Sequence, residues 1–140
     1  MAAGGHPAVR RGDAAAAQGR GRVEPRPGAP TTQEAATVRN PLFVDRAPTA
    51  ADYARGKVYY DSYCVFCHNA NGDGQGPVGQ SFVPFPADLR TARVRAYSDG
   101  QLLRAMLTGP GHEPVLAYTV HPEHRWYLVL YVRSLAGGQP

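Results

Sequence analysis

Long apolar runs are missing from this 140-residue sequence. The most apolar run, 126-WYLVLYV-132, ends at Arg133 and is far shorter than the roughly 18 apolar residues that a membrane-spanning helix needs. Residues 1–30 also lack the apolar core, about 7–15 residues long, that marks a secretion signal. The sequence therefore predicts no transmembrane segment and shows no recognisable export signal.

Large apolar side chains are scarce at the N-terminal end. Residues 1–40 consist mainly of Ala, Gly, Pro and Arg, and such a segment buries too little surface to offset the entropy lost when the chain is ordered. We therefore expect residues 1–45 to form a disordered or extended basic arm and residues 46–137 to form one folded domain. A domain of this size has a modest core, to which a bound cofactor would add apolar volume.

Strong charge of either sign is missing from the predicted domain. Six arginines against three carboxylates give residues 1–40 a net charge of +3, and residues 41–140 carry the remaining +1 of the total of +4. A domain this close to neutral offers no basic face to nucleic acid, which we exclude as a partner. The basic arm could instead lie against anionic lipid or an acidic partner subunit.

Cysteine is scarce as well, since Cys64 and Cys67 are the two cysteines of the chain. A structural zinc site needs four ligands, so zinc would have to recruit two histidines, and His121 and His124 are spaced more closely than in a zinc finger. A thioredoxin-like dithiol needs a preceding strand and a βαβ frame, which the pattern does not show. Two incidental cysteines beside a surface histidine are the plainest alternative.

The segment 63-YCVFCHNANG-72 matches the C-x-x-C-H pattern of covalent haem attachment. In this pattern two thiols add to the two vinyl groups of one haem, and the adjacent histidine becomes the proximal iron ligand. The pattern favours Cys64 and Cys67 as attachment points of a single haem c, with His68 as an iron ligand. Because haem c is attached outside the cytoplasm, we expect the protein at the periplasmic face of the cytoplasmic membrane.

Three helices are predicted around this segment. The first spans about residues 50–67, with Thr49 as its N-cap in a capping-box-like pair. The second spans about residues 99–108 after an S-x-x-Q capping box, and the third spans about residues 122–135 with a proline at its first position. Residues 71–89 carry glycine and proline without periodicity, which indicates irregular backbone that wraps a ligand. No strand pattern is convincing, so the predicted fold class is all-α.

The order of these pieces resembles a class I cytochrome c over residues 50–136, and most closely the small monohaem cytochrome subunit of alternative complex III, a quinol-oxidising respiratory assembly. The resemblance rests on 40-NPL-42, 55-RGKVYYDSYCVFCH-68, 72-GDGQG-76, 84-PFPADL-89, 98-SDGQLL-103 and 125-RWYLVLYVRSL-135. It implies an all-α cytochrome c-like haem domain with long irregular loops around the haem.

The resemblance also implies that the first and last helices cross. Gly56 is the candidate crossing point, because a glycine inside a helix usually marks the close approach of another backbone. Its implied partners are Val129 and Leu130, and Trp126 is expected to point towards the haem. Pro77 matches the position at which such cytochromes use a proline carbonyl to accept the Nδ1–H of the proximal histidine, although a plain turn proline is the alternative.

One position departs from the family. Where such cytochromes carry the methionine that binds iron opposite the histidine, 109-GPGHEP-114 places Glu113. The methionines of the chain are Met1 and Met106, and Met106 lies on the apolar face of the predicted second helix, where a core role is the stronger interpretation. Carboxylate disfavours ferrous iron, whereas imidazole suits both oxidation states. We therefore expect His112 as the second iron ligand, with Met106, another histidine or an open iron site as alternatives.

The predicted function is electron transfer by a monohaem c-type cytochrome, as a subunit of a membrane-bound quinol-oxidising respiratory or photosynthetic complex of the alternative complex III type. The expected partners are the other subunits of that complex and a redox partner cytochrome or oxidase. Such a subunit is not itself an enzyme. The alternatives are a haem sensor or enzyme with an open iron site, and a freely diffusing periplasmic electron carrier.

Overall fold

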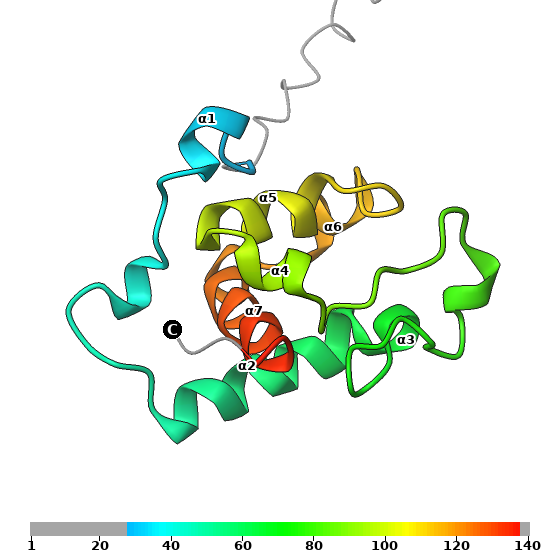
Figure 1. The fold of residues 1–140 in the computed structure, drawn as a ribbon, viewed down its shortest axis with the longest axis horizontal. Coiled ribbons are helices and arrows are strands. Elements are labelled where there is room, and N and C mark those ends of the chain that lie inside the picture. The colour runs from blue at the N-terminus through cyan, green and yellow to red at the C-terminus, as the bar shows by residue number, and fades with distance from the viewer. Residues whose placement is uncertain (1–27, 138–140) are drawn as a thin grey trace, which may run out of the picture.

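The computed structural model describes residues 28–137, and all regular elements of this part are helical (Figure 1). In chain order they are α1 (Thr32–Ala35), the 3-10 helix η2 (Pro41–Phe43), α2 (Ala50–Tyr63), α3 (Val65–His68), the 3-10 helix η3 (Gly79–Ser81), α4 (Ala92–Ala96), α5 (Asp99–Thr108), α6 (Val115–Thr119) and α7 (Pro122–Leu135). Residues 28–137 contain no strand, so the predicted all-α class is confirmed and is consistent with a cytochrome c-like fold. Within the same residues no helix is both long and apolar enough to cross a membrane.

The three longest helices begin where their capping residues predict. The Thr49 hydroxyl accepts the Asp52 N–H while the Asp52 carboxylate accepts the Thr49 N–H, and Ser98 and Gln101 form the same reciprocal pair before α5. Each pair satisfies backbone N–H groups that have no partner inside the helix. Helix α7 begins with Pro122, whose missing N–H costs nothing at a first helical position. The predicted spans of the second and third helices are confirmed.

The first predicted helix differs from the structure because it breaks at Cys64. The Cys64 N–H still bonds to the Tyr60 carbonyl at 2.8 Å, but its φ of −119° ends α2 there, and α3 starts with the next residue. Helix α3 then ends at Asn69, whose φ of 66° and ψ of 164° lie outside the helical range. Apolar periodicity continues across the break, which is why the sequence pattern predicted one continuous helix.

Two clusters of buried apolar side chains form the core. The first cluster joins α4, α5 and α7 and consists of Val94, Leu102, Leu103, Leu107, Val129 and Ala136. The second cluster joins α2 to α7 and to the segment just before α7. It consists of Tyr60, Val120 and Leu128. Met106 packs against both clusters, so its side chain has the core role that its helix face predicted.

Helices α2 and α7 cross in direct contact, as the resemblance implied (Figure 1). Gly56 lies at this crossing, and a Cβ built on it would lie 2.5 Å from the Tyr127 carbonyl oxygen and 2.9 Å from Tyr131 Cβ. The implied contact of Gly56 with Val129 and Leu130 is therefore wrong. Val129 belongs to the cluster shared with α5, whereas Tyr127 and Tyr131, one turn apart, face α2.

Residues 30–40, which fall within the expected arm, are held against the helical domain by hydrogen bonds. The backbone N–H of Asn40 bonds to Asp99 Oδ2 at 2.8 Å, and its side-chain amide bonds to the Trp126 carbonyl at 2.9 Å. The Ala35 carbonyl accepts the Ser98 hydroxyl. These contacts use small residues and backbone groups, so the scarcity of large apolar side chains did not reveal them. Residues 1–27 lie outside the described part.

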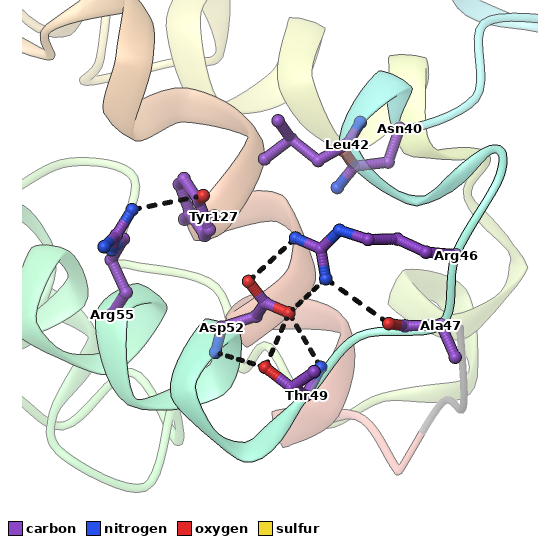
Figure 2. A network of polar contacts seen from close by, with 8 residues as sticks. All are labelled: Asn40, Leu42, Arg46, Ala47, Thr49, Asp52, Arg55 and Tyr127. Carbon is purple, nitrogen blue, oxygen red and sulfur yellow. Dashed lines mark hydrogen bonds and ion pairs between the residues drawn. The ribbon is translucent and has the colours of Figure 1, made fainter.

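The Asp52 carboxylate ties the segment before α2 to the helix (Figure 2). It accepts hydrogen bonds from Arg46 Nη1 and Nη2 at 2.7 and 3.0 Å, and from the N–H and hydroxyl of Thr49 at 2.7 and 2.9 Å. The hydrogen bonds from Arg46, followed by those from Thr49, hold the pKa of Asp52 well below its usual range. The buried carboxylate is thus fully paired, and it fixes the entry into α2.

Candidate functional site

Cys64 and Cys67 lie at the junction of α2 and α3. Both thiols are free and partly buried. Burial, with a smaller contribution from Cys67, raises the pKa of the Cys64 thiol to about 12. A raised pKa makes a thiol a poor nucleophile, so Cys64 lacks the lowered pKa that is typical of a redox-active dithiol. The two thiols instead remain available for thioether bonds.

The His68 imidazole is held in one tautomer. It is 8% exposed, and its Nδ1 lies 2.9 Å from the Ala87 carbonyl oxygen. A carbonyl can only accept, so Nδ1 carries the proton and Nε2 presents a free lone pair. Burial lowers the pKa of His68, and the neighbouring His112 lowers it further. A neutral imidazole whose Nδ1–H is anchored on a carbonyl is the usual form of a metal-binding histidine.

Glycines bring the Ala87 carbonyl to this ring. The segment after η3 returns to α3, and a hydrogen bond of 2.7 Å from the Leu89 N–H to the Gly72 carbonyl holds it there. The Gly74 N–H bonds to the His68 carbonyl at 2.9 Å. A Cβ at Gly74, where φ is 81°, would lie 2.5 Å from the Pro86 carbonyl oxygen. The close approach of residues 86–87 to His68 thus requires glycine at position 74.

Ala87 is a functional residue that sequence reasoning missed. The resemblance quoted 84-PFPADL-89 without giving any of its residues a role. An isolated glycine in a turn-rich loop, such as Gly74, signals the close approach of another backbone. The identity of that backbone depends on a contact between residues distant in sequence, which no local pattern encodes.

Pro77 does not accept the His68 hydrogen bond, so that prediction is wrong in this structure. Pro77 is exposed. Its neighbours dock on α3, where the Gly76 N–H bonds to the Cys67 carbonyl and the Val78 N–H to the Phe66 carbonyl, each at 3.0 Å. These bonds hold the proline segment beside the backbone of α3, and the returning segment that carries Ala87 reaches the ring instead.

Trp126 does not lie with the haem-attachment residues either. It packs against the cluster of α4, α5 and α7, whereas Cys64 packs against the cluster of α2 and α7. Val129 follows Trp126 by three positions, so both side chains occupy the face of α7 that meets α5. The expected direction of Trp126 towards the haem stays a prediction.

The structure brings His112 next to His68. The two ring centroids are 5.9 Å apart, and the ring planes are inclined by 63°. His112 lies in the loop between α5 and α6, and its Nδ1 lies 3.0 Å from the Ala105 carbonyl oxygen. The two histidines predicted as iron ligands thus meet, although 44 positions separate them in the chain.

Tyr60 supports the turn that carries His68. Its ring is fully buried, and its hydroxyl donates to the Asn69 carbonyl at 2.6 Å. This bond links the residue that ends α3 to the last turn of α2. Burial, the main cause, raises the pKa of the Tyr60 hydroxyl well above its usual range, so the hydroxyl remains a donor at any physiological pH.

Apolar side chains are exposed on α3 and on the segment that follows it. They are Phe66, Val78, Phe82, Val83 and Phe85, with exposed fractions of 55%, 44%, 41%, 96% and 67%. Residues 75–87 carry no charged side chain. Exposed apolar surface of this extent suits a ligand or a partner. Thiols for the vinyl groups, an imidazole for the iron and apolar surface for the porphyrin lie together, so the residues of this site fit haem c.

The other histidines of the described chain form a separate aromatic cluster at the start of α7. The ring of His124 stacks on Tyr59 with centroids 3.8 Å apart, and its Nδ1 lies 2.9 Å from the Tyr63 hydroxyl. The His121 ring centroid lies 5.2 Å from that of His124. Within residues 28–137, no group of three or more His, Cys, Asp and Glu residues is placed to hold a metal ion. A zinc site with four protein ligands is therefore not assembled in the described residues.

No protein-family model matches this sequence. Over 35 residues, or 25% of the chain, the sequence is 46% identical to a thiosulfate dehydrogenase of Thiomonas intermedia (strain K12). The chain spans 11% of the length of that protein, so the similarity is local. Taken with the all-helical fold and the C-x-x-C-H turn, it is consistent with a c-type cytochrome and points to no particular subfamily.

Proposed function

We propose that this chain is a monohaem c-type cytochrome that transfers electrons as a subunit of a membrane-bound, quinol-oxidising complex of the alternative complex III type, at the periplasmic face of the membrane. The observation that carries the proposal is the turn at α3. It presents two free thiols and a neutral imidazole whose Nδ1–H is anchored on Ala87. Haem c, when bound, supplies one-electron redox chemistry.

The residues of the chain hold and orient this group. Cys64 and Cys67 would bind it covalently, and His68 would bind the iron through Nε2. The Ala87 carbonyl fixes the His68 ring and increases its basicity, because the Nδ1–H donates to it. No acid or base has to move a proton for an electron to pass, so these residues need no further catalytic group.

The choice of complex is supported by the ordered segments of resemblance from residue 40 to residue 135. The similarity to a thiosulfate dehydrogenase covers too little of that protein to extend the proposal to thiosulfate.

The test uses the full chain, tagged and matured with haem in its native host. We expect it to co-purify from solubilised membranes with quinol-oxidising activity, and its haem to be reduced when quinol is added. Recovery of the haem-loaded chain alone in the soluble fraction would contradict membership of a complex and favour a freely diffusing carrier. Haem that binds carbon monoxide and is not reduced by quinol would favour the sensor or enzyme.

A further inference from the structure

We infer that His112 is the second axial ligand of the haem iron, so that this cytochrome holds its iron between two imidazoles. The inference rests on the proposed function, because it needs haem c at Cys64 and Cys67. Haem iron receives four nitrogens from the porphyrin, so two protein ligands complete its coordination. His68 and His112 are the two histidines of residues 28–137 that meet at the cysteine-bearing turn.

The distance between the rings suits a shared metal ion. With centroids 5.9 Å apart, the imidazoles are not stacked on one another. A bond from imidazole to a metal ion is about 2 Å long, and two such bonds plus the radii of the two rings span a similar distance. Little movement of the loop would be needed for both rings to bind one iron.

Both rings are also held in the tautomer that a ligand requires. The Nδ1 of His68 donates to the Ala87 carbonyl at 2.9 Å, and the Nδ1 of His112 donates to the Ala105 carbonyl at 3.0 Å. In each ring Nε2 is therefore the nitrogen with the free lone pair. A backbone carbonyl on the other nitrogen is the usual support of a metal-binding histidine, and here both candidates have one.

Gly109 positions His112. The Ala105 carbonyl, near the C-terminal end of α5, accepts both the Gly109 N–H at 2.9 Å and the His112 ring. A Cβ at Gly109 would lie 2.5 Å from that carbonyl oxygen and 3.4 Å from His112 Nδ1. Any side chain at position 109 would therefore displace the acceptor that orients the ring. Gly109 has no side chain that could bind iron, so its role is to position the His112 ring.

The competing donors are engaged elsewhere or unsuited. Met106 packs against both core clusters, so its sulfur could reach the iron only if α5 lost those contacts. Glu113 is exposed, and its carboxylate would favour ferric over ferrous iron. His124 is stacked on Tyr59 at the start of α7.

The test is near-infrared magnetic circular dichroism and electron paramagnetic resonance of the haem-loaded full chain. Wild type should show low-spin haem with two imidazole ligands. His112→Ala should lose that signal and become high-spin, and added imidazole should restore the low-spin form. His112→Met should show the spectral band of methionine sulfur bound to iron. Its reduction potential should be higher, since methionine ligation raises the potential. Gly109→Ala should give a mixture of spin states at unchanged helix content.

The matched control is His121→Ser, which removes an exposed histidine but keeps a side-chain acceptor at the N-cap of α7. Its spectra should equal those of wild type. The inference would be overturned by an unchanged spectrum in His112→Ala, by a methionine-to-iron band in wild type, or by high-spin wild type. Each of these results would leave covalent haem in place. Protein without covalent haem would instead overturn the proposed function, and the inference with it.

Discussion

The helical frame, made of α2, α5 and α7, and the ligand-side segment, residues 69–91, are stabilised in different ways. The frame buries large side chains such as Tyr60, Leu107 and Leu128, each with an exposed fraction of 0%. In the ligand-side segment the buried residues are glycines, Gly72, Gly74, Gly76 and Gly79. Its large apolar side chains Val78, Phe82, Val83 and Phe85 are exposed, and Leu89 alone of the segment's leucines, valines and phenylalanines packs against a core cluster. The segment, at the edge of the fold in Figure 1, is held by backbone hydrogen bonds to α3.

This difference indicates how the two regions depend on haem. Buried apolar area stabilises the frame with or without a cofactor. The ligand-side segment has little apolar burial of its own, and such regions open at low free energy. A porphyrin against its exposed apolar side chains would supply the missing burial.

The largest expected effect comes from Leu128→Ala, which removes apolar volume from the frame. Leu128 lies on α7 and is fully buried in the cluster that joins α7 to α2. We therefore expect the free energy of unfolding to fall by about 2–5 kcal/mol. Urea unfolding followed by far-ultraviolet circular dichroism measures this change. Val58→Ala on α2, at a side chain that is 61% exposed, should stay within about 0.5 kcal/mol of wild type. Equal losses in the two variants would contradict the proposed role of the frame.

A smaller and more local effect is expected from Gly74→Ala in the ligand-side segment. The new Cβ would meet the Pro86 carbonyl at a φ of 81°, so we expect a loss of about 1–3 kcal/mol and displacement of Ala87 from His68. Haem incorporation should fall while the helix content of the frame is retained. Optical quantification of haem per protein, together with circular dichroism, measures both quantities.

Gly137→Ala provides the matched control for Gly74→Ala. Gly137 has a similar φ of 74°, but nothing lies within 4 Å of its built Cβ. Gly137→Ala therefore introduces the same backbone strain as Gly74→Ala, but its new Cβ meets no other atom. If it reduced haem incorporation as strongly as Gly74→Ala, the close approach of residues 86–87 would not be what holds His68.

The smallest effect is expected from Asp52→Asn, at the start of the frame. Hydrogen bonds from Arg46 and Thr49 depress the pKa of Asp52 in the folded protein below its ordinary value of 3.8. Their stabilisation is therefore complete above about that pH and is lost as the pH falls towards the lowered folded pKa. The variant should be less stable than wild type at neutral pH, by less than Leu128→Ala, and the difference should shrink in acid.

Thermal unfolding at a series of pH values checks this prediction. Asp61→Asn is the control, because the Lys57–Asp61 pair is an exposed i,i+4 ion pair, with side chains 59% and 43% exposed. Asp61→Asn should change the neutral-pH melting temperature less than Asp52→Asn does. A constant difference between wild type and Asp52→Asn down to acidic pH would show that the carboxylate is not the source of the effect.

The same two regions differ in how far the sequence predicted them. The starts of α2, α5 and α7 were predictable because capping depends on residues within three positions, as with Thr49 and Asp52. The partners of Gly56 were not, because α7 is apolar on more than one face and periodicity alone does not say which face meets α2. The contact between Ala87 and His68 depends on how the ligand-side segment returns to α3, which is a long-range property of the fold.

The side chains of the site were predictable from the sequence, whereas the backbone groups that orient them were not. Cys64, Cys67 and His68 follow from a short motif, and the approach of His112 to His68 was expected from the departure at Glu113. The carbonyls that orient the two rings belong to Ala87 and Ala105. Any residue type can supply a backbone carbonyl, so no sequence signal marks them.

Covalent attachment of one haem through Cys64 and Cys67 is the central claim, and intact-protein mass measurement after acid–acetone extraction tests it most directly. The full chain, matured in a host that can attach haem c, should stay red and carry the added mass of one haem, because thioether bonds survive extraction. Cys64→Ala combined with Cys67→Ala should yield colourless protein without the added mass. Wild-type protein that releases its haem intact, or whose mass equals that of the polypeptide alone, would contradict the claim.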